Sequence, residues 1–409
     1  MTSSERDNIA AAWLMLLALT TAFALSQSYR TVAAIMAPRL QADFGLTAQA
    51  LGLFAGAFHF AFGALQLFMG IGIDLYGVRR TVLAAFPLAI AGAVLSALST
   101  NFPVLVAGQV LIGIGCAPAF LVCTVFIARR FPADRFASVS GLTLGIGSVG
   151  MLLTGTPLAW LIEASSWRTG FWALALCSAL AWAVIFWRVR EPAPTTPPVK
   201  VPVVAALRSY GALFGLPHTL GIVALACVTY AAFITLRGLW LGPLLIERHG
   251  FSLVQSGNVA VIVSVVGMFG PPLFGRLDPG PATRRRWIVG FTLVVAALFG
   301  AMAVTRAAWL DVGAAIAVGL ASGYIVLQYA DVKAAYPAHM TGRAMAVLTM
   351  AMFLGVAVMQ WLTGVVASAA AAHGFNPFSA VLAQTIAALL LLGATAFAAL
   401  PTPLPAMQT

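Results

Sequence analysis

The sequence predicts an all-α integral membrane protein in which twelve transmembrane helices form two pseudo-symmetric six-helix bundles. Its composition is the first observation: 61% of the 409 residues are hydrophobic and only 8% are charged. A soluble domain carries roughly a quarter charged residues. So few charges cannot cover a water-facing surface, and most of the surface must therefore face lipid. The other two observations are a series of long apolar runs and an internal repeat.

Each apolar run is about 20 residues or longer, which is the length that crosses a bilayer as a helix. A helix satisfies the backbone hydrogen bonds of such a run internally, as lipid requires. The first run is too long for a signal-peptide core and a second run follows it, so we expect it to be retained. The predicted spans are residues 9–37, 50–73, 81–100, 104–127, 136–162, 169–187, 217–246, 256–274, 287–305, 311–333, 344–366 and 378–400.

A proline-rich stretch separates the first six spans from the last six. Prolines crowd residues 192–202, which is typical of a semi-rigid linker. We therefore expect an N-terminal six-helix bundle at residues 1–187, a cytoplasmic linker at 188–216 and a C-terminal six-helix bundle at 217–409. Alternating loops place most Lys and Arg residues on the linker side, so the positive-inside bias predicts that both termini are cytoplasmic.

A pattern in the first half of the chain recurs 205 positions later. Residues 38–52 read Pro-x6-Gly-Leu-Thr-x4-Gly, and residues 243–257 read Pro-x6-Gly-Phe-Ser-x4-Gly. The same register aligns Gly70 with Gly275, and the arginine pair 79–80 with the pair 284–285. A shared register at half the chain length indicates two parallel repeats, with a substrate path between them.

The loop after the second span carries a further motif. Its residues are Gly70, Asp74, Gly77, Arg79 and Arg80, in the spacing Gly-x3-Asp-x2-Gly-x-Arg-Arg. Together with the twelve spans and the central linker, this motif resembles the loop signature of the major facilitator superfamily. The resemblance implies two bundles that rock about a central site, with the motif as a breakable gate. The alternative is that these residues only anchor the loop.

The chain also departs from that family pattern. Gln109 stands where the superfamily usually carries an arginine in the fourth helix, and Thr156-Pro157 replaces the Gly-Pro pair of drug antiporters. Tyr29-Arg30 and residues 336–343 are similar to bacterial organic-anion and nitrate/nitrite-type members. The asparagine-bearing nitrate signature is absent, so the similarity favours an organic anion.

Two arginines lie within the spans, where a cation costs roughly 2.5–3.5 kcal/mol on insertion scales. Arg30 precedes Pro38 by eight residues, and Arg237 precedes the matching Pro243 by six. They therefore lie at similar depth in equivalent helices. A guanidinium matches a carboxylate bidentately, so we expect both to bind an anionic cargo between the bundles. The alternatives are snorkelling to the interface and a structural ion pair.

Polar and aromatic side chains accompany these arginines or line other central spans. The expected substrate-binding residues are Arg30, Arg237, Gln27, Tyr29, Tyr230, Trp240, Tyr324, Gln328 and Gln360. For Gln360, a structural hydrogen bond between helices is the alternative.

Two titratable residues are candidates for proton coupling. His59 lies near the middle of the second span, and its unperturbed pKa of about 6.5 suits titration near neutral pH. The alternative is a neutral packing histidine. Asp331 lies near the end of the tenth span, where it is either functional or only an end charge. We find no mid-membrane carboxylate that would bind a cationic cargo.

The predicted function is secondary active transport of a small organic anion, preferably a carboxylate, by alternating access. An exporter of amphipathic drugs or metabolites, and a non-transporting sensor on the same scaffold, are the alternatives. No phosphate loop, catalytic constellation or metal-ligand spacing occurs, so we expect no enzymatic activity, cofactor or metal. The basic residues are scattered, which argues against nucleic acid. The expected partners are the anion, protons and membrane lipids, with a monomer in the bacterial inner membrane.

Overall fold

The computed structural model describes residues 3–132, 135–190, 210–211 and 213–400, and these residues form helices and short connections without any strand. Eleven of the described helices are long and apolar enough to cross a membrane. A twelfth crossing consists of Ala48–Ala64 and Gln66–Ile73, which are bent by 41° relative to one another. The predicted all-helical fold with twelve spans is confirmed.

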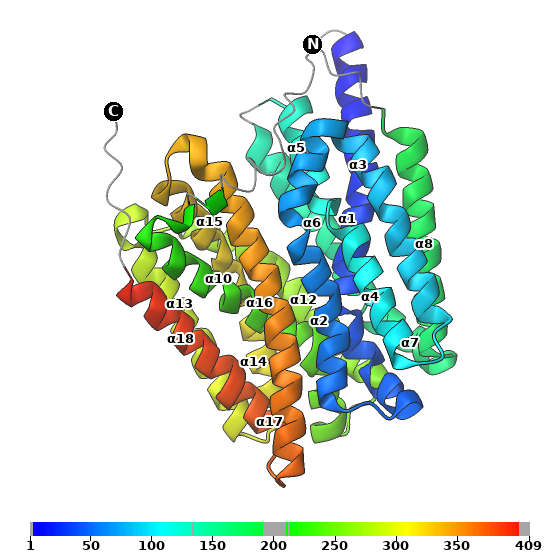
Figure 1. Ribbon diagram of the computed structural model, residues 1–409, viewed down its shortest axis with the longest axis vertical. Helices are drawn as coiled ribbons and strands as arrows, with labels where there is room; N and C mark the ends of the chain where they lie inside the picture. The colour runs from blue at the N-terminus through cyan, green and yellow to red at the C-terminus, as the bar shows by residue number, and fades with distance from the viewer. Residues whose placement is uncertain (1–2, 133–134, 191–209, 212, 401–409) are drawn as a thin grey trace.

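Several spans of the first half are divided into shorter helices. Pro118 and Pro157 lie at two of these divisions, because proline lacks the N–H that continues a helix. The elements of this half, blue to green in Figure 1, are α1 (Ser3–Phe44), α2 (Ala48–Ala64), α3 (Gln66–Ala97), α4 (Phe102–Cys116), α5 (Ala119–Arg130), α6 (Phe136–Leu153), α7 (Thr156–Ala164) and α8 (Trp167–Arg188).

The second half contains π-helical segments within two of its spans. Such segments insert an extra residue per turn and often occur at functional sites. The elements, green to red in Figure 1, are α10 (Pro217–Thr235), η2 (Leu236–Trp240), α11 (Leu241–Pro243), η3 (Leu244–Arg248), α12 (Leu253–Arg276), α13 (Pro281–Val304), α14 (Ala308–Ala321), η4 (Ser322–Tyr324), α15 (Ile325–Ala335), α16 (Ala338–Ala372), α17 (Pro377–Ser379), η5 (Ala380–Ala387) and α18 (Ala388–Ala399).

The internal repeat is visible in the turn that precedes the second crossing of each half. Gly45 and Gly250 have positive φ angles of 61° and 70°, a conformation that glycine adopts without steric cost. Two residues later, Thr47 and Ser252 cap α2 and α12 by accepting a hydrogen bond from the backbone three residues on. The sequence pattern at offset 205 therefore encodes the same capped turn twice.

The register of the repeat changes at the next loop. Gly77 (φ 83°, ψ 170°) interrupts α3, and Gly280 (φ 82°, ψ 170°) precedes α13. These two glycines are 203 residues apart, so the second copy is two residues shorter here. By this backbone marker Arg284 corresponds to Thr81 and not to Arg79, which corrects the predicted alignment of the two arginine pairs.

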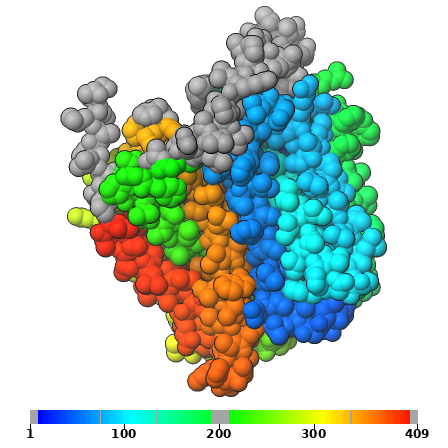
Figure 2. Space-filling model, in the orientation of Figure 1, coloured from blue at the N-terminus to red at the C-terminus, as the bar shows by residue number. Residues whose placement is uncertain are grey.

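The two halves meet along α2 and α16, which lie side by side in the middle of Figure 1 and touch over much of their length in Figure 2. Glycines line this contact. A Cβ atom on Gly56 would lie 2.9 Å from the carbonyl oxygen of Ala357, and one on Gly63 would lie 3.0 Å from Cβ of Phe353. Their small size lets the two backbones approach closely.

Most of the predicted linker, residues 188–216, lies outside the described residues. Helix α8 ends at Arg188 and α10 begins at Pro217. The division into two bundles at residues 1–187 and 217–409 stays a prediction, and the two parts are called halves below.

Candidate functional site between the two halves

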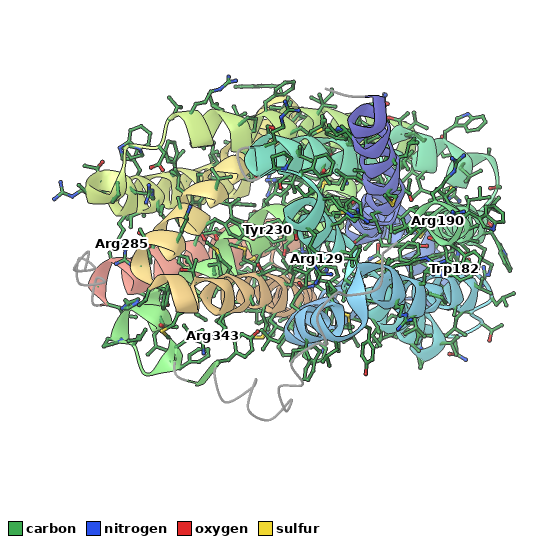
Figure 3. All side chains as sticks on the ribbon, turned by 90° about the horizontal axis from the view of Figure 1, so that it is seen from above. Arg129, Trp182, Arg190, Tyr230, Arg285 and Arg343 are labelled. Carbon is green, nitrogen blue, oxygen red and sulfur yellow. The ribbon has the colours of Figure 1, made fainter. Side chains whose placement is uncertain are left out.

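Arg30 lies in the middle of α1, and its side chain crosses the boundary between the halves. It is 6% exposed, and Nη1 donates a 3.2 Å hydrogen bond to the Tyr230 hydroxyl of α10. Viewed from above (Figure 3), Tyr230 lies near the middle of the molecule. The contact joins residues 200 positions apart in the chain, one from each half. Arg30 therefore faces the interface and not the lipid.

Two phenylalanine rings cover one side of the Arg30 guanidinium. Its carbon Cζ lies 4.8 Å from the ring centroid of Phe62 on α2 and 4.7 Å from that of Phe353 on α16. The two centroids are 4.3 Å apart, so the three groups form a nearly equilateral triangle. A cation over an aromatic face gains about 0.5–2 kcal/mol, which offsets only part of the cost of its burial. The sequence analysis missed both rings, although Phe62 follows His59 by one helical turn.

No carboxylate neutralises Arg30 or Arg237 among the described ion pairs. The acidic side chains that form ion pairs have other partners: Asp43 binds Arg168, Asp278 binds Arg284, Asp331 binds Arg285, and Asp311 binds Arg248 and His249. Arg30 Nε is buried, and its N–H donates to no acceptor in the described part of the chain. A buried charge without a counter-ion is costly, so it requires compensation from elsewhere.

Arg237 also crosses between the halves, but by a different route. It lies in the π-helical segment η2 and is completely buried. Its Nε donates to Ser264 Oγ of α12 at 3.0 Å, and its Nη2 donates to the Met151 carbonyl of α6 at 3.0 Å. The hydrogen-bond partners of Arg237 therefore belong to α12 and α6, whereas Arg30 contacts α2, α10 and α16.

In the described structure, the two guanidinium groups consequently share no hydrogen-bond partner or ring contact. The residue after Arg237 explains this difference, because a Cβ on Gly238 would lie 2.8 Å from the backbone oxygen of Arg30. Successive helical residues point about 100° apart, so the segment that touches Arg30 turns Arg237 toward another face. The expectation that both arginines meet one cargo is not supported by their contacts in this conformation.

Arg237 Nη1 is also buried without a hydrogen-bond partner in the described structure, and so are polar atoms of three other predicted residues: Gln27, His59 and Gln360. His59 Nδ1 lies 3.1 Å from the Ala55 carbonyl, whereas Nε2 has no partner. The His59 ring stacks on Phe353, the same ring that contacts Arg30. Unpaired buried polar atoms are rare and destabilising. These atoms lie on α1, α2, η2 and α16, so the interface between the halves contains buried polar groups whose hydrogen bonds are unsatisfied.

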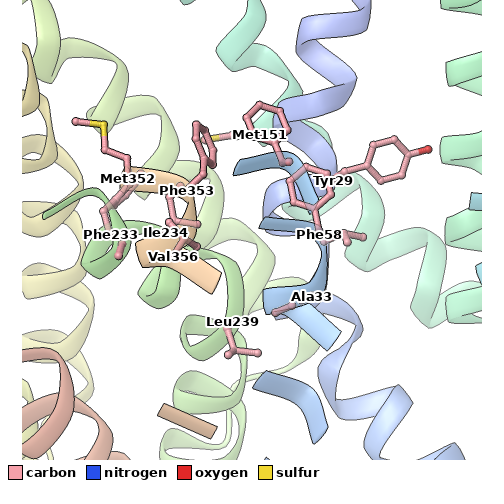
Figure 4. Packing of buried hydrophobic residues seen from close by; sticks show 14 of the residues in the cluster. Tyr29, Ala33, Phe58, Met151, Phe233, Ile234, Leu239, Met352, Phe353 and Val356 are labelled. Atoms are coloured by element: carbon pink, nitrogen blue, oxygen red, sulfur yellow. The ribbon is translucent and has the colours of Figure 1, made fainter. Parts of the chain in front are cut away.

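Four predicted substrate-binding residues instead have partners within their own half. Tyr29 points away from Phe353 into the N-terminal half (Figure 4), and its hydroxyl lies 3.0 Å from Ser178 Oγ. The other three are in the C-terminal half: Trp240 donates to Thr363 at 2.9 Å, Tyr324 lies 2.9 Å from Thr292, and Gln328 donates to Thr229 at 3.0 Å. These contacts hold neighbouring helices together, and the structure does not bring these side chains to Arg30.

Asp331 is paired within the C-terminal half. Its Oδ2 lies 3.3 Å from Arg285 Nε, and Arg285 Cζ lies 4.3 Å from the Phe397 ring centroid. The acid is therefore buried and paired with a basic neighbour, and its functional role stays a prediction. Asp331 belongs to another set of contacts than His59.

The predicted gate lies in α3 and its kink at Gly77. Arg79 Nη2 donates to the Phe186 carbonyl at 3.0 Å, within the N-terminal half. Arg80 is exposed and Gly70 is half-buried, while the side chain of Asp74 lies outside the described part. In the second half, Arg284 forms a 2.6 Å ion pair with Asp278. The Arg284 guanidinium holds the pKa of Asp278 below its usual value by hydrogen bonding to the ionised carboxylate.

Several curated proteins are similar to parts of the chain. The hexuronate transporter of Bacillus subtilis is 26% identical over 248 residues, which cover 59% of this chain and 58% of that protein. The protein named "probable sulfoacetate transporter SauU" of Cupriavidus necator is 25% identical over 152 residues, which cover 37% of this chain and 35% of that protein. The chain thus spans less than two thirds of the length of these curated relatives.

Solved structures extend the comparison to almost the whole fold. A nucleoside transporter has a TM-score of 0.76 at 13% identity, covering 95% of this chain and 99% of that one. A D-xylose-proton symporter has a TM-score of 0.70 at 16% identity, covering 93% and 97%. The similar proteins are transporters and not enzymes. The Major Facilitator Superfamily model matches residues 17–360, and the chain belongs to this family.

Proposed function

We propose that the protein is a secondary active transporter that moves a small organic anion across the bacterial inner membrane by alternating access. The observation that carries this proposal is the burial of Arg30 between the halves without a carboxylate partner in the described chain. An anionic cargo is the missing counter-charge. The names of two relatives, for hexuronate and sulfoacetate, denote organic anions and support the same cargo class.

The surroundings of Arg30 suit a carboxylate better than a hydrophobic group. The phenylalanine rings cover one side of the guanidinium, and Nη1 is held by a neutral hydroxyl. A carboxylate offers stronger, charge-assisted hydrogen bonds than a tyrosine hydroxyl. Cargo binding therefore replaces the Tyr230 contact and supplies a partner to Nε. The unpaired Oε1 of Gln27 can accept a hydrogen bond from a polar group on the cargo, and the unpaired amide of Gln360 can both accept and donate.

The same contacts link cargo binding to movement of the halves. Arg30 belongs to the N-terminal half, whereas Tyr230 and Phe353 belong to the C-terminal half. An anion that draws Arg30 away from these partners changes the contacts that join the two bundles. A ligand shifts a conformational equilibrium only through such differential contacts. Arg237, held by Ser264 and Met151, is the second anion-binding candidate and requires release from those partners.

Proton coupling is proposed at His59. Its Nε2 atom is unpaired, and its ring stacks on Phe353 beside Arg30. A change in the charge of His59 acts directly on a neighbouring guanidinium and its anion. Asp331 is a second candidate. Protonation of its carboxylate would alter the ion pair that it forms with Arg285 at 3.3 Å. We further propose cytoplasmic termini and a monomeric carrier.

Two measurements test the function. Purified full-length protein is heated with a panel of organic anions, and a cargo is expected to raise its Tm by mass action. Proteoliposomes are then assayed for uptake of the anion that stabilises most, with and without a pH gradient. Carboxylates are expected to raise the KM of this uptake, whereas lipophilic cations are not. Competition by lipophilic cations and not by anions would instead favour the drug exporter, and an absence of any flux would refute transport.

A further inference from the structure

A cavity between the halves is separate from the Arg30 contacts. It has a volume of about 320 Å³, within the order of size of small-ligand pockets, and lies near the ends of α1, α2, α16 and α17. These helix ends are at the bottom of Figure 1, away from the two chain termini. The N-terminal half contributes Gln41, Thr47 and Leu51 to the walls, and the C-terminal half contributes Trp240, Glu247 and Phe378.

Among the residues that the structure describes, the only charged side chain that lines this cavity is the carboxylate of Glu247. It forms no ion pair with any residue that the structure describes. The two basic residues that follow it in sequence have another partner: Arg248 Nη1 lies 3.2 Å from Asp311 Oδ2, and His249 Nε2 lies 2.7 Å from the same atom. The negative charge of Glu247 is therefore available to a ligand that enters the cavity.

Two aromatic rings form the other recognition element. The Trp240 and Phe378 rings are perpendicular, with centroids 6.2 Å apart, and both line the cavity. The indole N–H of Trp240 is already bonded to Thr363 at 2.9 Å, so the ring offers its aromatic surface to a ligand and not a donor. Tryptophan is the best aromatic partner for a cation, and a nearby carboxylate adds direct charge attraction.

We propose that this cavity binds a small organic cation, of the alkylammonium or aryl-alkylammonium class, between Glu247 and the Trp240 and Phe378 rings. The site differs from the anion site in both location and charge. Because its walls come from both halves, a bound cation holds the halves in the arrangement seen here. Such a ligand inhibits transport without competing with the cargo, since it favours one conformation over the other.

The direct test uses purified full-length protein and benzyltrimethylammonium as the probe, with neopentylbenzene, its uncharged isostere, as the control ligand. Saturable quenching of tryptophan fluorescence and a rise in Tm are expected with the cation alone. Glu247→Gln is expected to raise the dissociation constant about tenfold or more, since the charge attraction is lost. Glu163→Gln is the matched control, because it neutralises an exposed carboxylate of α7 that does not line the cavity.

The proposal is overturned if the wild-type protein shows no saturable binding of the cation, if the uncharged neopentylbenzene binds equally well, or if Glu247→Gln binds as tightly as the control. Failure of anion transport does not affect these binding measurements, so the two proposals fail separately. Where uptake is active, the cation is expected to lower kcat and leave KM unchanged in the wild type. Glu247→Gln should lose this inhibition while Glu163→Gln retains it.

Discussion

Arg30 of the N-terminal half donates a 3.2 Å hydrogen bond to the hydroxyl of Tyr230 in the C-terminal half. A neutral phenol is a weak partner for a buried guanidinium, which forms stronger bonds with anions. The contact also lies between the two parts of the molecule that alternating access requires to move. Tyr230 is therefore best understood as the group that holds Arg30 when the cargo is absent.

Replacing Arg30 should separate transport from stability. Arg30→Met is expected to lower uptake by about 100-fold, because charge-assisted hydrogen bonds contribute roughly 1.5–3 kcal/mol each. The Tm of the empty protein should stay the same or rise, since a buried charge without a counter-ion is removed. Proteoliposome uptake and thermal melts measure the two effects. Arg306→Met, at an exposed position between α13 and α14, is the control and should transport normally.

Arg30→Lys should restore uptake poorly, because an ammonium group lacks the planar fork that binds a carboxylate bidentately. Kinetics of uptake at increasing cargo concentration measure this loss. Wild-type kinetics in Arg30→Lys would remove the bidentate mode, and wild-type uptake in Arg30→Met would remove the anion site altogether.

Arg237 should behave differently because it donates two hydrogen bonds in the described structure, to Ser264 and to the Met151 carbonyl, whereas Arg30 donates one, to Tyr230. Arg237→Ala deletes its hydrogen bonds to Ser264 and to the Met151 carbonyl, and it leaves a cavity in a fully buried region. We expect a loss of about 2–5 kcal/mol in stability, the range of large-to-small core substitutions, together with loss of uptake. Thermal melts without cargo make the comparison with Arg30→Met. An unchanged Tm in Arg237→Ala would show that the two bonds contribute little to the fold.

The close contact of α2 and α16 can be tested by replacing one of its glycines with valine. Gly56→Val places atoms where even a Cβ would lie 2.9 Å from the Ala357 carbonyl oxygen. The halves should then be unable to close at this contact, and uptake should fall by about tenfold or more, since one close contact of this kind costs about 1–3 kcal/mol. Gly290→Ala on α13 is the control, because no atom lies within 4 Å of its Cβ position. Equal uptake by both variants would argue that the contact has no functional role.

The Asp278–Arg284 pair predicts a pH dependence of stability. The pKa of Asp278 is lowered by hydrogen bonds from Arg284, so its contribution is fully present above the unfolded-state pKa of about 3.9. The contribution is lost as the pH falls through the lower folded-state pKa. Asp278→Asn should therefore reduce Tm at neutral pH and match the wild type in strong acid. A constant difference in Tm across this range would contradict the assignment.

The sequence predicted the fold well because lipid imposes strong constraints on it. Apolar length identified the spans, and the repeat at offset 205 marked Gly45 and Gly250 as equivalent positions, at which the structure shows the same capped turn. Arg30 was identified as a site residue because a charge inside a span is conspicuous. Its contact with Tyr230 of the other half required the structure.

The direction in which individual side chains point could not be predicted in the same way. Helices in this fold are apolar on nearly all sides, so periodicity does not show which face meets another helix. Trp240 illustrates a second difficulty, because the π-helical turn Leu236–Trp240 changes the angular spacing of its residues. Tyr29 and Tyr324 were assigned to the site by residue type, whereas their hydroxyls join helices within one half.

The glycines that face α16 from α2 have a consequence for how the carrier moves. At Gly52 and Gly56 the backbone of α2 rests on the backbone of α16, so the two helices can pivot at these positions without an exchange of side-chain rotamers. A contact of this kind keeps the free-energy barrier to rocking low, whereas interdigitated leucine side chains would raise it. The absence of side chains at Gly52, Gly56 and Gly63 thus suits the contact of α2 and α16 to repeated conformational change during transport.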